Sequence, residues 1–194
     1  MARRTQAQMA ETRAALLATA RDYFCRLGYA ETSMDEVAAS INLTRGALYH
    51  HFGDKKGLFA AVVEQVDIQM NARLQAISEH SIGQWEGFCQ RCHAYLEMAL
   101  EPEYQQIILR DAKAVLGDFL VKSNLQCTEQ IDVLLRELVE KEIIGDVDTR
   151  ALAFLINGGL AEAAYWISQG DSQKRLQKSI DAIDKILAGL LVKQ

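Results

Sequence analysis

The stretch of sequence that decides the fold runs over residues 32–59 and reads TSMDEVAASINLTRGALYHHFGDKKGLF. Apolar residues recur at helical spacing on both sides of a short polar connection. The pattern predicts two short helices, over 34–41 and 45–51, with Asn42 at the turn, because asparagine tolerates the left-handed backbone conformation better than most residues. Two short helices joined in this way have the dimensions of a helix-turn-helix.

Residues that commonly cap helices precede each predicted helix. Ser33 stands three residues before a glutamate, which is the spacing of a capping box, in which hydroxyl and carboxylate each satisfy a free backbone amide. Thr44 precedes the second short helix and Asp54 precedes a long one. Upstream, apolar residues over 16–27 predict a first helix that Gly28 ends. Three short helices followed by a long one is therefore the expected beginning of the chain.

The rest of the chain shows the same helical periodicity and no convincing two-residue alternation, so we expect an all-α protein. The single proline, Pro102, breaks one helix, and Gly117 separates two others. Asp146 or Asp148 begins a further helix, and Ser172 caps the last one.

Composition narrows the class of protein. The chain has 194 residues, of which 49% are hydrophobic and 24% charged, as in ordinary globular proteins. Its apolar runs are far shorter than the roughly 20 residues of a membrane span, and its N-terminus is polar, so neither a membrane protein nor a signal peptide is indicated. Four cysteines are too few for a disulfide framework. We expect a cytoplasmic protein with reduced thiols.

The net charge of −5 conceals an asymmetry. Residues 1–57 contain eight Lys and Arg against six Asp and Glu, whereas the remaining residues contain thirteen against twenty. Because nucleic-acid binding depends on the local potential, the acidity of the whole chain does not exclude DNA as a partner.

The second short helix carries side chains suited to DNA. In a helix-turn-helix this helix lies in the major groove, where Arg45 can donate two hydrogen bonds to guanine. Small residues beside it allow close approach, and hydroxyl, imidazole and lysine groups suit phosphate oxygens. The residues predicted to contact DNA are Thr32, Ser33, Thr44, Arg45, Gly46, Ala47, Tyr49, His50, Lys55 and Lys56. Periodicity alone is equally compatible with a small helical bundle in which these residues only pack.

Residues 13–59 closely resemble the tetracycline-repressor (TetR) family of bacterial regulators, most densely over 32–38 and 44–59. The resemblance implies a homodimer of helical subunits. Its N-terminal three-helix domain, here residues 1–54, binds DNA, and a larger domain, residues 55–194, dimerises and binds a small-molecule effector that releases the operator. We therefore expect a transcriptional repressor that acts on a palindromic operator.

Carried over by position, the recognition helix of the family falls on residues 44–51 and its phosphate-binding lysine on Lys55. Two positions depart from the pattern. Asn42 stands where the family commonly has glycine, and Lys56 stands where an acid is common. The turn accepts the first change, and the second adds a positive charge near DNA.

Two apolar faces in the C-terminal half could form a dimer interface. Small residues on the predicted helix that begins at Asp146 or Asp148 permit close packing with another helix. In the last helix, apolar residues recur at alternating four- and three-residue spacing, as in a coiled coil. Two such helices from each subunit would form a four-helix contact across a two-fold axis; alternatively, both faces fill the core of their own subunit. The interface residues so predicted are Leu155, Gly159, Ala163, Leu176, Ile180, Ile183 and Leu187.

Aromatic residues are the candidates for an effector pocket, because tyrosine and tryptophan line apolar pockets while offering a polar group. Ordinary core packing is the alternative for each of them. The pocket residues so predicted are Trp85, Phe88, Tyr95, Tyr104, Phe119, Phe154 and Trp166.

Cys89, Cys92 and His93 form a Cys-x-x-Cys-His sequence that resembles a c-type haem attachment site. Haem attachment of that kind occurs outside the cytosol, which disfavours it here. A regulator that senses metal or oxidants through these residues stays an alternative, with plain packing as the other. A closed zinc site needs further ligands that no spacing supplies, so no metal or cofactor is expected.

Two other classes of protein were weighed. The sequence has no Gly-rich phosphate loop, nucleophile elbow or His-Glu-x-x-His spacing, so an enzyme is not expected. A helical adaptor that binds only protein would leave the basic surface of Arg45 and Lys55 unexplained, and it predicts no salt-dependent affinity for DNA.

Overall fold

The computed structural model describes the backbone of residues 6–117 and 119–192, and the side chains of these except 119–124. Within these ranges the chain is helical, and the one β-type contact is an isolated antiparallel bridge between Ile144 and Leu191. The all-α prediction is confirmed. The elements are α1 (Gln6–Glu31), α2 (Met34–Ser40), α3 (Arg45–Phe52), α4 (Lys55–His80), α5 (Gln84–Glu97), the 3-10 turn η1 (Met98–Leu100), the π-helix η2 (Tyr104–Ala112), α6 (Lys113–Leu116), α7 (Phe119–Glu140), α8 (Thr149–Ser168) and α9 (Ser172–Ala188).

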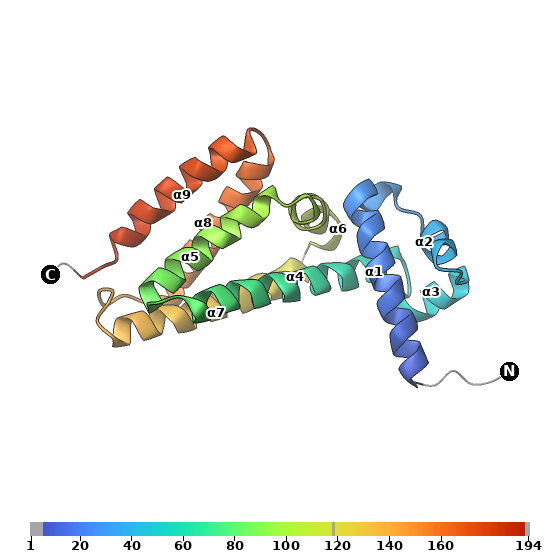
Figure 1. Ribbon diagram of the computed structural model, residues 1–194, viewed down its shortest axis with the longest axis horizontal. Coiled ribbons are helices and arrows are strands. Elements are labelled where there is room, and N and C mark those ends of the chain that lie inside the picture. The colour runs from blue at the N-terminus through green and yellow to red at the C-terminus, as the bar shows by residue number, and fades with distance from the viewer. Residues whose placement is uncertain (1–5, 118, 193–194) are drawn as a thin grey trace.

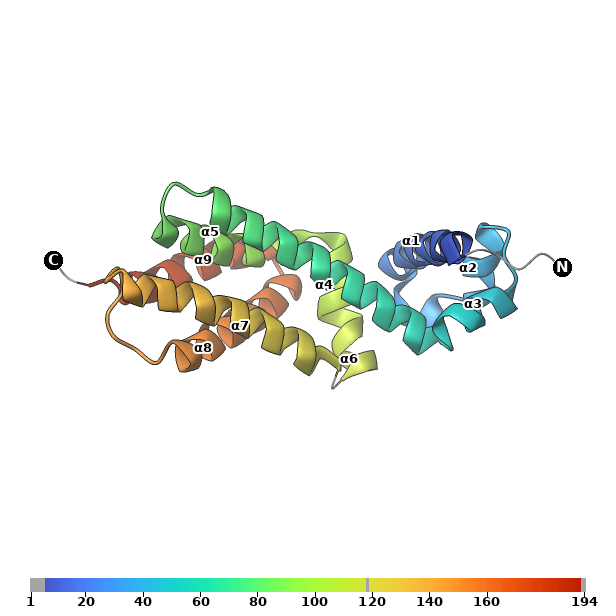
Figure 2. The same ribbon diagram turned by 90° about the horizontal axis from the view of Figure 1, so that it is seen from below.

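The molecule is elongated, with α1, α2 and α3 at one end and α5, α7, α8 and α9 at the other (Figure 1). Helix α4 runs lengthwise between the two ends, as the perpendicular view shows (Figure 2). No described helix has both the length and the apolar character needed to cross a bilayer.

The local signals at Asn42, Thr44 and Asp54 are confirmed, whereas the capping box predicted at Ser33 is formed only in part. Asn42 has a positive φ of 55° at the turn. The Thr44 hydroxyl accepts the backbone N–H of Ala47 at 3.3 Å, and the Asp54 carboxylate accepts that of Gly57 at 2.7 Å. The Ser33 hydroxyl oxygen accepts the backbone N–H of Glu36 at a long 3.5 Å. The described hydrogen bonds do not include the second bond of a capping box, from the Ser33 backbone N–H to the Glu36 carboxylate.

Gly28 interrupts α1 with a φ of 77° and a ψ of 172°. The regular helix thus ends where the sequence predicts, and a last short turn continues to residue 31. A Cβ atom at Gly28 would lie 2.8 Å from Nε2 of Gln106 and 3.3 Å from Oδ2 of Asp111, both on η2. The next amide, that of Tyr29, donates to Asp111 Oδ2 at 2.7 Å. Glycine is therefore required both by the backbone conformation and by the close approach of η2.

Three features differ from expectation. The first helix is not short, because α1 spans 26 residues, Gln6–Glu31. The predicted helix over 104–115 is a π-helix to residue 112 followed by one α-helical turn, a distinction that apolar spacing does not reveal. The last helix is capped by Asp171, which accepts the N–H of Lys174 at 3.3 Å, and Ser172 is its first residue. Asp148 caps α8, as one of the two alternatives proposed.

The core continues through α4. Its N-terminal half, including Phe59 and Val63, packs with α1, α2 and α3 and with Ile107 of η2. Its C-terminal half, including Met70 and Leu74, packs against η1 and η2. The division between residues 54 and 55 stays a prediction, and α4 supplies core residues to both sides of it.

We predict that Gly28→Ala lowers the melting temperature by about 2–12 °C. A side chain at this φ and ψ costs about 1–3 kcal/mol, and about 1 kcal/mol corresponds to roughly 2–4 °C in a domain of this size. Thermal unfolding followed by circular dichroism measures the shift. Gly145→Ala is the control, because a Cβ atom there meets nothing within 4 Å and its φ is not positive; equal melting temperatures for the two variants would contradict the assignment.

Candidate nucleic-acid interface

Helix α3 is held by one face and exposes the other. Leu48 is fully buried in the core shared with α1, α2 and α4, and Phe52 packs against that core. Because a helix turns about 100° per residue, this anchoring leaves the residues on either side of Leu48 facing outward. The structure thus brings the predicted contact residues together at the end of the molecule formed by α2 and α3 (Figure 1). The exposed or half-buried members of α3 and its cap are Thr44, Arg45, Gly46, Ala47, Tyr49 and His50.

Arg45 is exposed and held in place by two neighbours. Its Nη1 donates to the Asp35 carboxylate at 3.1 Å, and its Nη2 donates to the Tyr49 hydroxyl at 3.1 Å. The guanidinium also lies 5.0 Å from the centre of the Tyr49 ring. The Tyr49 hydrogen bond and the Asp35 charge raise the pKa of Arg45. These contacts are exposed to water and therefore weak, so a guanine edge can replace them.

Sequence reasoning did not identify the role of Asp35, which it assigned only to the start of α2. The carboxylate lies ten residues before Arg45, and only the helix-turn-helix brings them together. A second such residue is Arg13 on α1, whose guanidinium lies 5.2 Å from the centre of the Phe52 ring at the end of α3.

Lys55 stands at the start of α4 and is oriented by the end of α1. Its Nζ donates to the Ala30 carbonyl at 2.9 Å and lies 4.7 Å from the centre of the Tyr29 ring. An ammonium group has three donors, so this hydrogen bond positions the side chain and leaves donors for a phosphate oxygen. Lys56 beside it is exposed.

Thr32 requires a correction. Its side chain is 3% exposed, and its hydroxyl donates to the Gly28 carbonyl at 2.8 Å. The hydroxyl therefore completes the end of α1 and is not available to a phosphate. Ser33 is half-buried and uses its hydroxyl oxygen as the α2 cap.

The predicted dimer seam on α9 is partly buried within the subunit. Leu176 and Leu187 are 8% and 1% exposed and lie in the core that α9 shares with α5 and α8, so these two are corrected. Ile180 and Ile183, and Ala163 on α8, pack against the same core but are only half-buried. For these three residues the interface stays a prediction.

Helix α8 exposes a different apolar surface. Leu155 is 73% exposed, and a Cβ atom at Gly159 would meet nothing within 4 Å. Phe154 and Trp166 on the same helix are 48% and 43% exposed. Of the predicted interface residues, Leu155 and Gly159 are therefore the exposed ones.

The aromatic residues predicted to line an effector pocket do not come together. Phe88 is buried with Trp85 beside it, their ring centres 6.3 Å apart. Tyr95 and Tyr104 form an edge-to-face pair inside the subunit, and burial raises the pKa of Tyr95 to about 12. Large aromatic rings pack in the core because their burial removes a large apolar surface from water. Phe154 and Trp166 are exposed as described above, and the Phe119 side chain lies outside the described residues.

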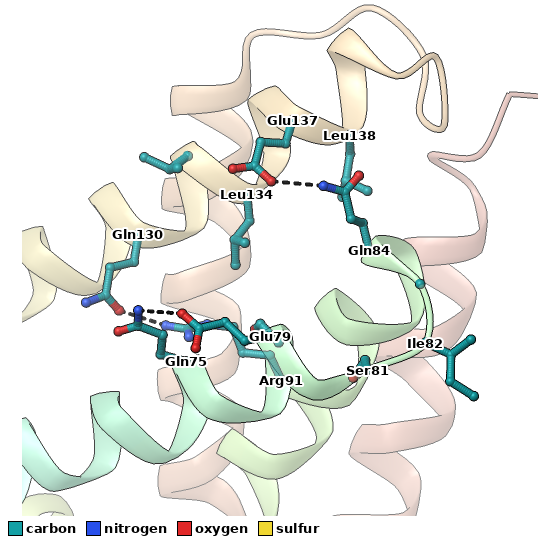
Figure 3. A pocket seen from close by; sticks show the side chains of 13 residues that line it. Gln75, Glu79, Ser81, Ile82, Gln84, Arg91, Gln130, Leu134, Glu137 and Leu138 are labelled. Atoms are coloured by element: carbon teal, nitrogen blue, oxygen red, sulfur yellow. Dashed lines mark hydrogen bonds between the residues drawn. The ribbon is translucent and has the colours of Figure 1, made fainter.

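A pocket of about 540 Å³ lies elsewhere, between the C-terminal end of α4, the connection to α5, α5 itself and α7 (Figure 3). None of the six described aromatic residues named above lines it. Arg91 is the buried charged residue among those that do. Sequence reasoning missed it, because Arg91 was read only as a spacer between two cysteines.

Cys89, Cys92 and His93 lie on α5 without forming a metal cluster. Burial raises the pKa of Cys89 to about 11 and that of Cys92 to about 12, which keeps both as thiols rather than the reactive thiolates. The Nε2 atom of His93 lies 2.5 Å from an Asp184 oxygen on α9. Among the described residues, no three His, Cys, Asp or Glu side chains are placed to hold a metal ion. The arrangement favours packing for this sequence.

Comparisons with known proteins agree with this geometry. The family model for "Bacterial regulatory proteins, tetR family" matches residues 16–62, and that for "Tetracyclin repressor-like, C-terminal domain" matches residues 85–190. A solved TetR-family transcriptional regulator from Pectobacterium atrosepticum is 56% identical, with a TM-score of 0.91 over 98% of this chain and 99% of that one.

Two curated relatives are more distant. The Transposon Tn10 TetC protein of Escherichia coli is 26% identical over 155 residues, which are 79% of this chain and 78% of the relative. The HTH-type transcriptional regulator AcrR of Shigella flexneri is 31% identical over 150 residues, 76% of this chain and 57% of the relative. The helix-turn-helix with its exposed Arg45 and the matches over both halves lead to one conclusion: the chain belongs to the TetR family of DNA-binding transcriptional regulators.

Proposed function

We propose that the protein is a homodimeric repressor that binds a palindromic operator and is released by a small-molecule effector bound in its C-terminal helices. The observation that carries the DNA-binding part is the presentation of Arg45 on the exposed face of α3, beside the oriented Lys55. Arg45 reads guanine in the major groove, and the lysines fix the position of the helix on phosphates.

The exposed apolar surface of α8 supports dimerisation. Phe154 and Leu155 are exposed apolar side chains on one turn of α8, and Trp166 is another about three turns further on, with the small residues Gly158 and Gly159 between them. Burying such a surface against a second copy removes it from water, and the glycines allow the two backbones to approach. A two-fold axis there sets the spacing of the two recognition helices, which must be about 34–36 Å, or a multiple of it, to enter successive major grooves.

The contacts between α1 and η2 supply a route from effector to DNA. Arg21 on α1 donates to both carboxylate oxygens of Glu103, at 2.5 and 2.6 Å, and also to Gln69 of α4 at 2.6 Å. Asp111 on η2 accepts the backbone N–H of Tyr29. A shift of η2 therefore moves α1, and with it the orientation of α3. Thermodynamic linkage requires that operator DNA weakens effector binding by the same factor by which the effector weakens operator binding.

The first test is selection of bound sites from random duplex DNA with the purified protein, repeated over a salt series. We expect a palindrome with guanine in each half-site and an affinity that falls steeply with salt, because lysines and arginines displace counterions. Selection of no sequence above background, with or without added salt, would contradict the proposal.

Arg45→Ala and Lys55→Ala separate sequence reading from positioning. Loss of Arg45 is expected to reduce discrimination at one base pair by about tenfold or more. Loss of Lys55 is expected to weaken all sequences alike and to reduce the salt slope by about one. Fluorescence anisotropy with matched and mutated sites measures both effects. Lys178→Ala on α9 is the charge-matched control, and an equal effect of all three variants would count against the recognition-helix assignment.

Leu155→Glu tests the dimer surface. A charge at the centre of an apolar contact is expected to raise the dimer dissociation constant more than about tenfold, since an unpaired buried charge is costly. Analytical ultracentrifugation measures the change, and operator affinity is expected to fall with it. Ile68→Glu, at a position on α4 that is 62% exposed, is the control. A dimer that survives Leu155→Glu unchanged would place the interface elsewhere.

A further inference from the structure

The pocket between α4, α5 and α7 has an apolar wall and a polar floor. Val133, Leu134 and Leu138 line it from α7, and Ile82 lies on the connection between α4 and α5. Figure 3 shows Arg91 and Gln130 on the side away from Ile82 and Gln84. A volume of about 540 Å³ is within the range of small-molecule sites, which is about 300–1,000 Å³.

Arg91 differs from the other described arginines in being buried. Arg21, Arg73 and Arg136 each bind a carboxylate, those of Glu103, Glu101 and Asp132. Arg91 is only 5% exposed, yet no ion pair among the described residues includes it.

The guanidinium of Arg91 is also short of acceptors. Its described hydrogen bond is a single one, from Nη2 to the Gln130 side-chain oxygen at 2.9 Å (Figure 3). Burial lowers the pKa of Arg91, so the protein carries an uncompensated desolvation cost at this position. A guanidinium presents five N–H donors in a fork that matches a carboxylate. Most of these donors are therefore free for a group that enters the pocket.

The opposite charge lies at the rim. Glu79 accepts a hydrogen bond from Gln75 at 2.8 Å, and Glu137 accepts one from Gln84 at 3.1 Å. Both glutamates are exposed and neither pairs with Arg91. Figure 3 shows Glu137 with Gln84 away from Arg91, so a molecule that extends from Arg91 toward Gln84 meets a positive charge at one end and a negative charge at the other. A second anionic group at the outer end of that molecule would be repelled.

We infer that this pocket binds a small organic monocarboxylate, with the carboxylate on Arg91 and the apolar body against Val133, Leu134 and Leu138. The inference deepens the proposed function and rests on it in one respect, that the bound acid is the effector. The acid supplies the counter-charge that Arg91 lacks. The exposed glutamates then favour ligands that carry a single negative charge over those that carry two.

The test uses two sets of probes on the full-length protein. Benzoate and octanoate are compared with the neutral benzamide and octanamide and with the diacids terephthalate and suberate, by thermal shift and then by calorimetry. We expect at least one monocarboxylate to raise the melting temperature at millimolar concentration, and its amide and diacid to do so far less. No shift with either monocarboxylate, or equal shifts with the amides, would overturn the inference.

Arg91→Met and Glu137→Gln test the two charges. Arg91→Met is expected to raise the dissociation constant of the bound acid at least about tenfold, because a charged hydrogen-bonded pair is lost. Without acid, its melting temperature is expected to equal or exceed that of the wild type, since an unpaired buried charge is removed. Glu137→Gln is expected to tighten binding and to admit the diacids. Arg110→Gln, which removes an exposed arginine of η2, is the control for net charge.

Retention of acid binding in Arg91→Met would overturn the site, and a large loss of stability without acid would show that Arg91 is structural. Operator release is measured separately, by anisotropy with the selected operator DNA. Acid binding through Arg91 without operator release would overturn its role as the effector site, while operator binding in the absence of acid would still support the proposed DNA-binding function.

Discussion

The close approach of α1 to η2 at Gly28 is the constraint on which the rest of the structure depends. At this point the backbone takes a conformation that only glycine adopts without strain, and a Cβ atom here would lie 2.8 Å from the Gln106 side chain of η2. The Asp111 carboxylate then accepts the first amide beyond the break. The same turn leads to Thr32 and the start of α2. The position of α2, and of α3 packed against it, therefore depends on this contact between α1 and η2.

Helix α4 provides the second link between the ends of the molecule. Asp54 begins it directly after α3, and its apolar face passes from the core around Phe59 to that around Leu74 without interruption. One continuous helix therefore supplies side chains to both cores. The pocket that contains Arg91 lies against the far end of this helix.

Local signals in the sequence were sufficient for the presence of the helices and for the exposed side of α3. Asn42, Thr44 and Gly28 act through their own backbone or the next turn, so their effects can be read from neighbouring letters. The resemblance over residues 13–59 then added the function. Long-range partners could not be read in this way. Leu176 and Leu187 form a true apolar stripe, but the pattern does not say whether the stripe meets its own subunit or a second one.

The candidate sites illustrate the same limit. Sequence reasoning placed an effector among aromatic residues, whereas their apolar area draws Phe88 and Tyr104 into the core. The pocket is instead built from residues contributed by three separated segments, and a buried arginine without a carboxylate is recognised only once its surroundings are known. Similarly, the pairing of Asp35 with Arg45 depends on the angle between α2 and α3.

That pairing has a consequence for how the protein chooses among DNA sequences. Under the proposed function, Arg45 must exchange its Asp35 contact for a base edge when it reads a guanine. A guanine repays the exchange with two acceptors, whereas at a base pair that offers fewer acceptors the guanidinium can stay on its own carboxylate. The cost of the exchange then falls on the correct site, and the benefit is that the reading side chain is already held in one orientation when the protein arrives at the DNA.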